Sequence, residues 1–348
     1  MVKIRVGIIG AGGISRSQHI PAWKKISGAE IIGVADTDGK RAADAAKENG
    51  IHKYFTDYRD LVREGIDVVD ICTPNRIHTG AVISALNAGK HVICEKPLSV
   101  STAEVRKMGE LADKKKLKLM TAQHMRWMPS TTAIKKWAET GTLGEVYHAR
   151  VRAFRRAFIP TAPGFIHGKL SGGGPCMDIG VHALDTCLHV MGFPKPVRVT
   201  GVAKTIFAKG YTIPGMWGEW DRKLMDVEDF AAGFVHFDNG ATMTVETAWL
   251  SHQEESEDFS FRVYGTKAGV QWPTAKYSTV VNSVFADGQL FMPKTDVWPH
   301  YEEIKAFYDC VTQNRPTPVP WTETIKVIAI LEAIYRSSDK EREVNVKF

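Results

Sequence analysis

Short apolar runs alternate with longer stretches of mixed polarity over the first third of the chain. The mixed stretches fit helices, and the apolar runs fit strands rich in Val and Ile. This alternation is typical of a doubly wound parallel sheet covered by helices on both faces, and we expect it to form a first domain over residues 1–124. The expected strands are Lys3–Ile9, Glu30–Ala35, Tyr54–Phe55, Val68–Cys72, His91–Cys94 and Lys118–Thr121.

The pattern changes after residue 124, where longer β-prone runs follow one another. Asn239-Gly240 between two such runs is the dipeptide of a tight hairpin. A second domain over residues 125–348, with a mainly antiparallel sheet, is therefore predicted. Its expected elements are a helix over Thr131–Glu139, strands over Glu145–Phe154, Val197–Ile206, Phe230–Phe237, Ala241–Trp249 and Phe259–Tyr264, closing helices over Tyr301–Gln313 and Thr322–Ser337, and a short strand over Glu343–Val346.

Composition narrows the class of protein. The 348 residues are 44% hydrophobic and 24% charged, as in an ordinary globular protein, and no apolar run approaches a membrane span. The first strand begins almost at once, so we expect no signal peptide and a cytoplasmic location. Five cysteines without a CxxC pair suggest reduced thiols. The net charge of +6 is spread along the chain, so we expect no nucleic-acid partner.

A glycine-rich turn, Gly10-Ala11-Gly12-Gly13, follows the first strand and leads into a helix. Such a turn directs backbone N–H groups and a helix N-terminus at a diphosphate. Gly10 permits the tight turn and Gly12 allows close approach of the pyrophosphate, whereas Ser15 replaces the third glycine of the usual fingerprint. Glycine turns also occur for purely conformational reasons, but this position in the chain favours dinucleotide binding.

Asp36 ends the second strand, where a carboxylate hydrogen-bonds a ribose 2′-hydroxyl. A carboxylate repels the 2′-phosphate of NADP, so NAD is the expected cofactor. Lys40 and Arg41 lie just downstream and leave NADP possible, although they also fit a solvated helix face.

Polar groups follow two later strands, at the carboxyl edge where such sheets bind ligands. Thr73-Pro74-Asn75 with His78 follows one, and Glu95-Lys96-Pro97 follows the next. The alternatives are an ordinary strand-to-helix turn, a packed histidine and a surface ion pair.

A second chemical stretch runs from Gly172 to Asp185. After three glycines and a proline, a helix is expected near Asp178, which places Asp178, His182 and Asp185 on one face. A carboxylate beside an imidazole is a general-base arrangement, and a surface pair or helix cap is the alternative. Metal binding by Asp178, His182 and His189 lacks a further convincing ligand, so no metal is expected.

Together these residues resemble the Gfo/Idh/MocA family of glucose–fructose oxidoreductase, inositol 2-dehydrogenase and related sugar dehydrogenases. The resemblance covers essentially the whole chain. It implies an N-terminal Rossmann domain and a C-terminal α/β domain whose large open sheet often forms the interface of a homodimer or homotetramer. It also implies cofactor-binding residues, which are Gly10, Gly12, Gly13, Ile14, Asp36, Thr73, Asn75, His78, Glu95 and Lys96.

The resemblance implies hydride transfer from a carbinol carbon to the nicotinamide while a base takes the hydroxyl proton. His182 is the expected base, and Lys96 is expected to hydrogen-bond the same oxygen. Asp178 would orient the sugar or hold the imidazole. A Lys96 with a pKa lowered by burial is the alternative base.

Other residues suggest a pocket for a sugar, glycoside or polyol. The irregular segment 210–226 contains Trp217 and Trp220, whose faces suit pyranose C–H groups, and Arg155 and His300 are further candidate contacts. A packing or interface loop is the alternative. A dehydrogenase acting on a ring hydroxyl is preferred. An inositol dehydrogenase, a redox-assisted glycoside-cleaving enzyme and a non-catalytic cofactor-binding regulator remain alternatives.

Overall fold

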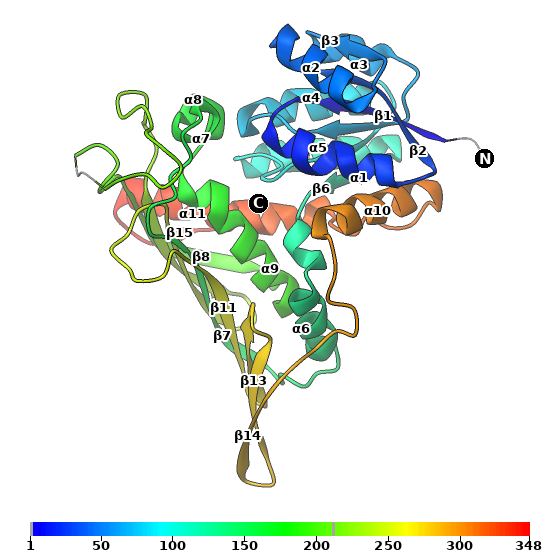
Figure 1. Cartoon of the computed structure of the whole chain (residues 1–348). Coiled ribbons are helices and arrows are strands. Elements are labelled where there is room, and N and C mark those ends of the chain that lie inside the picture. Colours follow the sequence, from blue (N-terminus) through cyan, green and yellow to red (C-terminus); the bar gives the residue numbers. More distant parts are fainter. Residues whose placement is uncertain (1–2, 211–212) are drawn as a thin grey trace. The chain divides into compact units, whose positions relative to one another are not determined.

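The computed structural model describes residues 3–210 and 213–348, so Tyr211 and Thr212 at the start of the aromatic segment lie outside the described residues. The chain forms two compact units (Figure 1). The first unit comprises residues 1–99, 103–124 and 298–324, and the second comprises residues 100–102, 125–297 and 325–348. The assignment of cofactor binding to residues 1–124 and of substrate binding to residues 125–348 stays a prediction.

The first unit is built on a six-stranded parallel sheet with strand order β3-β2-β1-β4-β5-β6. The order reverses beside β1, which creates the crevice where doubly wound sheets bind nucleotides. Each predicted strand of this sheet is confirmed to within one or two residues. The strands are β1 (Ile4–Ile9), β2 (Ala29–Ala35), β3 (Lys53–Phe55), β4 (Val68–Ile71), β5 (His91–Cys94) and β6 (Leu119–Thr121).

Helices connect the strands of the first unit, and their ends follow local sequence signals. Asp38 and Asp57 cap α2 and α3 by accepting backbone N–H groups of the first turn. A π-helical turn, η1, opens the helix after the glycine turn and continues as α1. The helices are η1 (Ser15–His19), α1 (Ile20–Lys25), α2 (Gly39–Asn49), α3 (Tyr58–Arg63), α4 (Asn75–Asn87), α5 (Thr102–Lys115) and α10 (Pro299–Thr312). The short helix η2 (His124–Trp127) has only its first residue in this unit.

The second unit contains a nine-stranded sheet with order β14-β13-β12-β11-β7-β10-β9-β8-β15. Neighbouring strands are antiparallel except for β7 and β10, so the predicted mainly antiparallel sheet is confirmed. The Asn239-Gly240 turn joins β9 to β10 as expected. The strands are β7 (Val146–Arg155), β8 (Pro196–Lys204), β9 (Phe230–Phe237), β10 (Thr242–Ala248), β11 (Glu257–Gly265), β12 (Ala268–Trp272), β13 (Lys276–Val281), β14 (Val284–Gln289) and β15 (Val344–Asn345).

Helices cover one face of this sheet. Ile334 of α11 packs directly against Gly201 and Gly233, where any larger residue would clash with it. Helix α9 packs on β7 and β11, and α6 packs on α9 and β12. The helices of this unit are α6 (Pro129–Glu139), α7 (Pro163–Ile166), α8 (Gly168–Ser171), η3 (Cys176–Gly180), α9 (Val181–Met191) and α11 (Trp321–Lys340).

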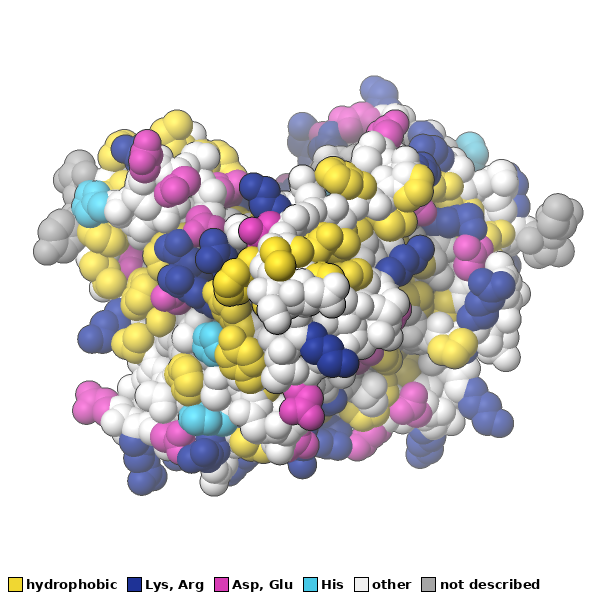
Figure 2. Space-filling view, turned by 90° about the horizontal axis from the view of Figure 1, so that it is seen from below, with side chains coloured by type: hydrophobic (Ala, Val, Ile, Leu, Met, Phe, Trp, Pro, Cys, Tyr) yellow, Lys and Arg dark blue, Asp and Glu magenta, His cyan; other side chains and the backbone are white. Residues whose placement is uncertain are grey.

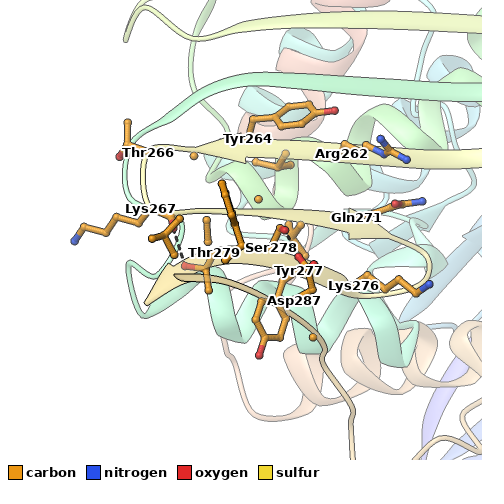
Figure 3. Close-up of a pocket in the computed structure, with 18 of the residues that line it drawn as sticks. Arg262, Tyr264, Thr266, Lys267, Gln271, Lys276, Tyr277, Ser278, Thr279 and Asp287 are labelled. Atoms are coloured by element: carbon orange, nitrogen blue, oxygen red, sulfur yellow. Dashed lines mark hydrogen bonds between the residues drawn. The ribbon is translucent and has the colours of Figure 1, made fainter. Parts of the chain in front are cut away.

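The β13–β14 hairpin was not predicted from the sequence and exposes several large apolar side chains. Phe285 is 85% exposed, and Val280, Val281 and Val284 are also exposed. In the view from below, hydrophobic side chains gather in the middle of the face (Figure 2). A groove of about 890 Å³ runs along β11 to β14, with Tyr264 and Tyr277 on its strands (Figure 3). None of the predicted site residues lines this groove.

Two expectations from composition can be compared with the structure. All five cysteines are free and buried. Within the described part of the chain, no helix combines the length and apolar character needed to cross a membrane.

Candidate active site

The glycine turn has the geometry of a phosphate cradle. Gly10 has φ +97°, and a Cβ at this position would lie 2.6 Å from the carbonyl oxygen of Cys72, so only glycine fits. A Cβ at Gly12 or Gly13 would meet nothing within 4 Å, which leaves their backbone open to a ligand. Ile14 follows with its side chain 36% exposed. Ser15 opens η1 with its side chain buried, and its hydroxyl finds no hydrogen-bond partner among the described residues.

Asp36 is tied to this turn. One carboxylate oxygen accepts a hydrogen bond from the backbone N–H of Ala11 at 2.9 Å, and the other accepts one from Asp38 at 2.9 Å. The guanidinium of Arg41 approaches the same carboxylate at 3.5 Å and also pairs with Asp38. Arg41 therefore lies beside the expected ribose-binding carboxylate, whereas Lys40 pairs with Asp44.

The turn after β4 is braced from within the fold. His78 is fully buried, and its ring nitrogens lie 2.8 Å from the carbonyl oxygens of Pro97 and Thr73. Burial lowers the pKa of His78. His78 thus joins the turns that follow β4 and β5, on which Thr73, Asn75, Glu95 and Lys96 lie. Contact of these residues with the cofactor stays a prediction.

Glu95 belongs to a buried charge network that the sequence did not reveal. His19 lies between two carboxylates, with Nδ1 2.9 Å from Asp70 and Nε2 2.9 Å from Glu95. Trp23 donates its indole N–H to Asp70 at 2.8 Å. Although burial opposes the charge, Asp70 holds the pKa of His19 well above its usual value. Although burial alone would raise it, His19 lowers the pKa of Glu95 to about 2.

This network fixes the position of Lys96. The second carboxylate oxygen of Glu95 accepts a hydrogen bond from the backbone N–H of Lys96 at 3.0 Å. A permanently ionised Glu95 therefore holds the backbone from which the Lys96 side chain extends. Two features of the sequence could have pointed to this network. Asp70 is an acid within the otherwise apolar strand Val68–Ile71, and His19 is a histidine in the first helix.

His300 belongs to an adjoining cluster of the first unit, with its ring edge-on to that of His19 at a centroid distance of 6.4 Å. Its ring stacks on that of His124, with centroids 4.0 Å apart and 15° between the planes. Burial lowers the pKa of His124 to about 4 and that of His300 to about 3. Glu303 lies within reach of both rings. His300 was expected to contact substrate, which stays a prediction, and sequence reasoning did not single out His124 or Glu303.

In the second unit, two side chains at the ends of neighbouring strands lie against the carboxylate of Asp178. Trp249, just beyond β10, donates its indole N–H to Asp178 at 3.2 Å. Arg155, at the end of β7, lies 3.9 Å from the same carboxylate and donates to Glu257 at 2.7 Å. Asp178 and Arg155, both predicted to bind substrate, are therefore adjacent. Asp178 lies in the π-helical turn η3 rather than in a regular helix.

His182 follows one helical turn after Asp178 and is 8% exposed. Asp185, expected on the same face, instead forms a buried two-point ion pair with Arg126, with both N–O distances 2.7 Å. Its carboxylate is therefore committed to Arg126 and does not orient His182. No clear signal in the sequence indicates that Asp185 pairs with Arg126, because Arg126 stands outside any motif and the π-helical turn before α9 could not be foreseen.

The glycine loop before Asp178 is locked by Glu228, which sequence reasoning missed. The Glu228 carboxylate accepts hydrogen bonds from the backbone N–H of Gly174 at 2.8 Å, from that of Cys176 at 3.2 Å and from the Tyr335 hydroxyl at 2.7 Å. A Cβ on Gly174 would lie 1.9 Å from the backbone oxygen of Glu228. Burial raises the pKa of Glu228 to about 7.

Trp217 presents an aromatic surface beside this group. Its side chain is 50% exposed, and the guanidinium of Arg155 lies 4.7 Å from its ring centroid. Phe158 packs near the ring at 5.4 Å. Trp220, in contrast, is 4% exposed and donates its indole N–H to the backbone of Ala208, so it serves packing.

The two units thus offer complementary chemistry. The first unit supplies an open glycine turn and an ammonium on an anchored backbone. The second supplies an imidazole and a carboxylate in one helical turn, next to a guanidinium and an exposed indole. Such groups can bind a dinucleotide and a hydroxylated ligand and can move a proton near neutral pH.

Comparisons with known proteins agree with this description. Residues 4–123 match the family described as "Oxidoreductase family, NAD-binding Rossmann fold", and residues 131–271 match the "GFO/IDH/MocA C-terminal domain". D-glucoside 3-dehydrogenase of Escherichia coli is 30% identical over 99% of this chain and 97% of its own length. Levoglucosan dehydrogenase of Pseudarthrobacter phenanthrenivorans is 27% identical over 78% of this chain and 73% of its own.

Solved structures show the same fold. The structure titled "Levoglucosan dehydrogenase, complex with NADH and L-sorbose" superposes with a TM-score of 0.85, 23% identity and full coverage of both chains. One titled "Crystal structure of GenD2 from gentamicin A biosynthesis in complex with NAD" gives a TM-score of 0.83 at 22% identity, covering 100% of this chain and 97% of that one.

Proposed function

Because the chain belongs to the Gfo/Idh/MocA family of NAD-binding oxidoreductases, we propose that it oxidises a ring hydroxyl of a sugar or glycoside. The observation that carries this proposal is the grouping of Asp178, His182 and Arg155 beside an exposed Trp217. These groups suit a ligand with several hydroxyls and an apolar ring face. The names of the relatives, a D-glucoside 3-dehydrogenase and a levoglucosan dehydrogenase, support the same substrate class.

The cofactor site fits NAD. The backbone at Gly12 and Gly13 is open where a pyrophosphate would approach, and Asp36 stands at the end of β2 for the ribose hydroxyls. Arg41 beside Asp36 offers a charge to the 2′-phosphate of NADP, so we propose NAD as the preferred cofactor and NADP as the weaker one.

When bound, the nicotinamide supplies the acceptor for a hydride from the carbinol carbon. We propose that His182 takes the hydroxyl proton of the substrate as general base. Lys96 would donate a hydrogen bond to the same oxygen and stabilise its developing negative charge. Asp178, held by Trp249, would accept a hydrogen bond from a neighbouring hydroxyl and so fix which carbon reacts.

Incubation of the protein and NAD with sugars, glycosides and inositols tests this proposal. We expect formation of reduced cofactor, measured by its absorbance, with at least one pyranose or pyranoside and more slowly with inositols. Faster turnover of an inositol would identify an inositol dehydrogenase instead. Cleavage of a glycoside without net reduced cofactor would identify a redox-assisted glycoside-cleaving enzyme. Cofactor binding without turnover of any polyol would identify a regulator.

We also propose that the outer face of the nine-stranded sheet forms the subunit interface of a homodimer or homotetramer. Its support is the group of exposed apolar side chains on β13 and β14, which includes Val284 and the 85% exposed Phe285. Light scattering after size exclusion measures the molecular mass, and a monomer at micromolar concentration would contradict this assembly.

We also propose a cytoplasmic location. The use of the cellular NAD pool and the presence of reduced cysteines favour this location.

A further inference from the structure

Three potential metal ligands converge within the first unit. His124 directly follows the segment after β6, and His300 and Glu303 lie three residues apart on α10, hence on one side of that helix. One ligand atom from each of the three residues lies within 4.8 Å of the other two. Two segments far apart in sequence therefore bring two imidazoles and a carboxylate together.

The carboxylate of Glu303 is poorly compensated in its present surroundings. The residue is fully buried, and among the described residues neither of its oxygens has a hydrogen-bond partner of ordinary geometry. Burial and the nearby charge of Glu95 raise its pKa, while His19 and the backbone N–H of Gln123 only partly oppose them. Ionising a buried carboxyl group without a close partner is unfavourable. A bound cation would remove that cost.

The two imidazoles of this cluster are partly buried, and each can offer a ring nitrogen to an ion. Their rings stack in nearly parallel planes, so one ring must turn about its Cβ–Cγ bond to direct a nitrogen at the same ion as the other. That torsion is soft, and the stacking that it gives up is a weak interaction.

We propose that His124, His300 and Glu303 bind one divalent first-row transition metal ion, with Zn²⁺ as the best match. Two imidazoles and one carboxylate form a known three-ligand set for Zn²⁺, and the same donors also suit neighbouring metals of the series. The ion would fasten the start of α10 to the segment after β6.

The second histidine-containing cluster of the described residues is a weaker candidate. His19, Asp70 and Cys72 are also close enough to share an ion. However, Nδ1 of His19 is already occupied by Asp70, and burial raises the pKa of the Cys72 thiol, which disfavours the thiolate. This cluster is satisfied without a metal.

Titration of the chelator-stripped full chain with Zn²⁺ tests the proposal without any activity measurement. We expect one equivalent to bind in calorimetry and to raise the melting temperature. Co²⁺ in place of Zn²⁺ should give visible absorption of nitrogen and oxygen coordination, with no sulfur-to-cobalt charge-transfer band. Absence of zinc binding, or appearance of that sulfur band, would overturn the assignment. Both results are obtained with the wild-type chain and need no variant to fold.

Two matched variants locate the site. Glu303→Gln keeps the shape of the side chain and removes the ligand charge, so we expect zinc affinity to fall by about a hundredfold or more. Glu302→Gln makes the same change one residue earlier on α10 and should bind zinc as the wild type does. Equal affinity in wild type and Glu303→Gln would contradict the site. This inference does not rest on the dehydrogenase activity, which can hold or fail separately.

Discussion

At the scale of single residues, the proposed chemistry depends on how each reactive side chain is held. Lys96 extends from a backbone anchored by Glu95, which is in turn held by His19. Asp178 is held by Trp249 and lies one helical turn before His182. Fixed side chains of this kind lower the reorganisation needed to reach the transition state.

Removal of the proposed base should reduce turnover more than binding. For His182→Ala we expect kcat to fall by about a hundredfold or more, since general-base catalysis contributes at least that much, with little change in KM for the sugar. Steady-state kinetics with the best substrate of the panel measures this. His189→Ala, the same change seven residues later in α9, is the matched control. Near-normal turnover in both His182→Ala and Lys96→Ala would show that neither residue has the proposed role.

Asp36 should govern the choice between NAD and NADP. Asp36→Ser removes the charge that repels a 2′-phosphate and leaves Arg41 to pair with it, so the ratio of kcat/KM for NADP over NAD should rise by about tenfold or more. Asp38→Ser removes a neighbouring carboxylate that also pairs with Arg41 and should change the ratio less. An unchanged ratio in Asp36→Ser would contradict the assigned role of Asp36.

At the scale of elements, the glycine loop before η3 is shaped by the buried Glu228. Three donors converge on its carboxylate, and Gly174 has no space for a side chain. The loop therefore has a defined conformation in spite of its three consecutive glycines. Glu228 acts as a positioning residue for the turn that carries Asp178.

Glu228 should make the stability of the protein depend on pH. Its pKa is raised from 4.5 to about 7, so between these values the folded state keeps a proton that the unfolded state has lost. The free energy of unfolding should therefore decrease as pH rises from 4.5 to 7, by up to about 3 kcal/mol. Urea unfolding across this range measures the slope. Glu228→Gln should flatten it, whereas Glu255→Gln at an exposed position should not. An equal slope in all three proteins would contradict this role.

Elements with strong local patterns could be predicted from the sequence, and those defined by tertiary contacts could not. The apolar runs of the parallel sheet and the Asn239-Gly240 hairpin appear where the pattern placed them. The β13–β14 hairpin carries its apolar residues in one group beside its turn, Val280–Val281 and Val284–Phe285, so it lacks the alternation of apolar and polar residues that marks a strand. The lysine, histidine and aspartate of the proposed mechanism stand in recognisable motifs. His19, Glu228 and Glu303 act through partners distant in sequence, which no local pattern records.

At the scale of the whole molecule, the proposed reaction assigns different tasks to the two folding units. The parallel sheet of the first unit supplies the dinucleotide cradle and Lys96. The helix-covered face of the second sheet supplies Asp178, His182 and Arg155. The central claim is that these groups serve a single event, the passage of hydride from a sugar ring carbon to NAD.

Transfer of isotope from substrate to cofactor tests this claim most directly. The protein is incubated with NAD and a pyranoside deuterated at its ring carbinol carbons, and both products are analysed by mass spectrometry. We expect one deuterium in each reduced cofactor and one keto sugar for each cofactor reduced. A reduced cofactor without deuterium, or a sugar product formed with no net reduced cofactor, would contradict it.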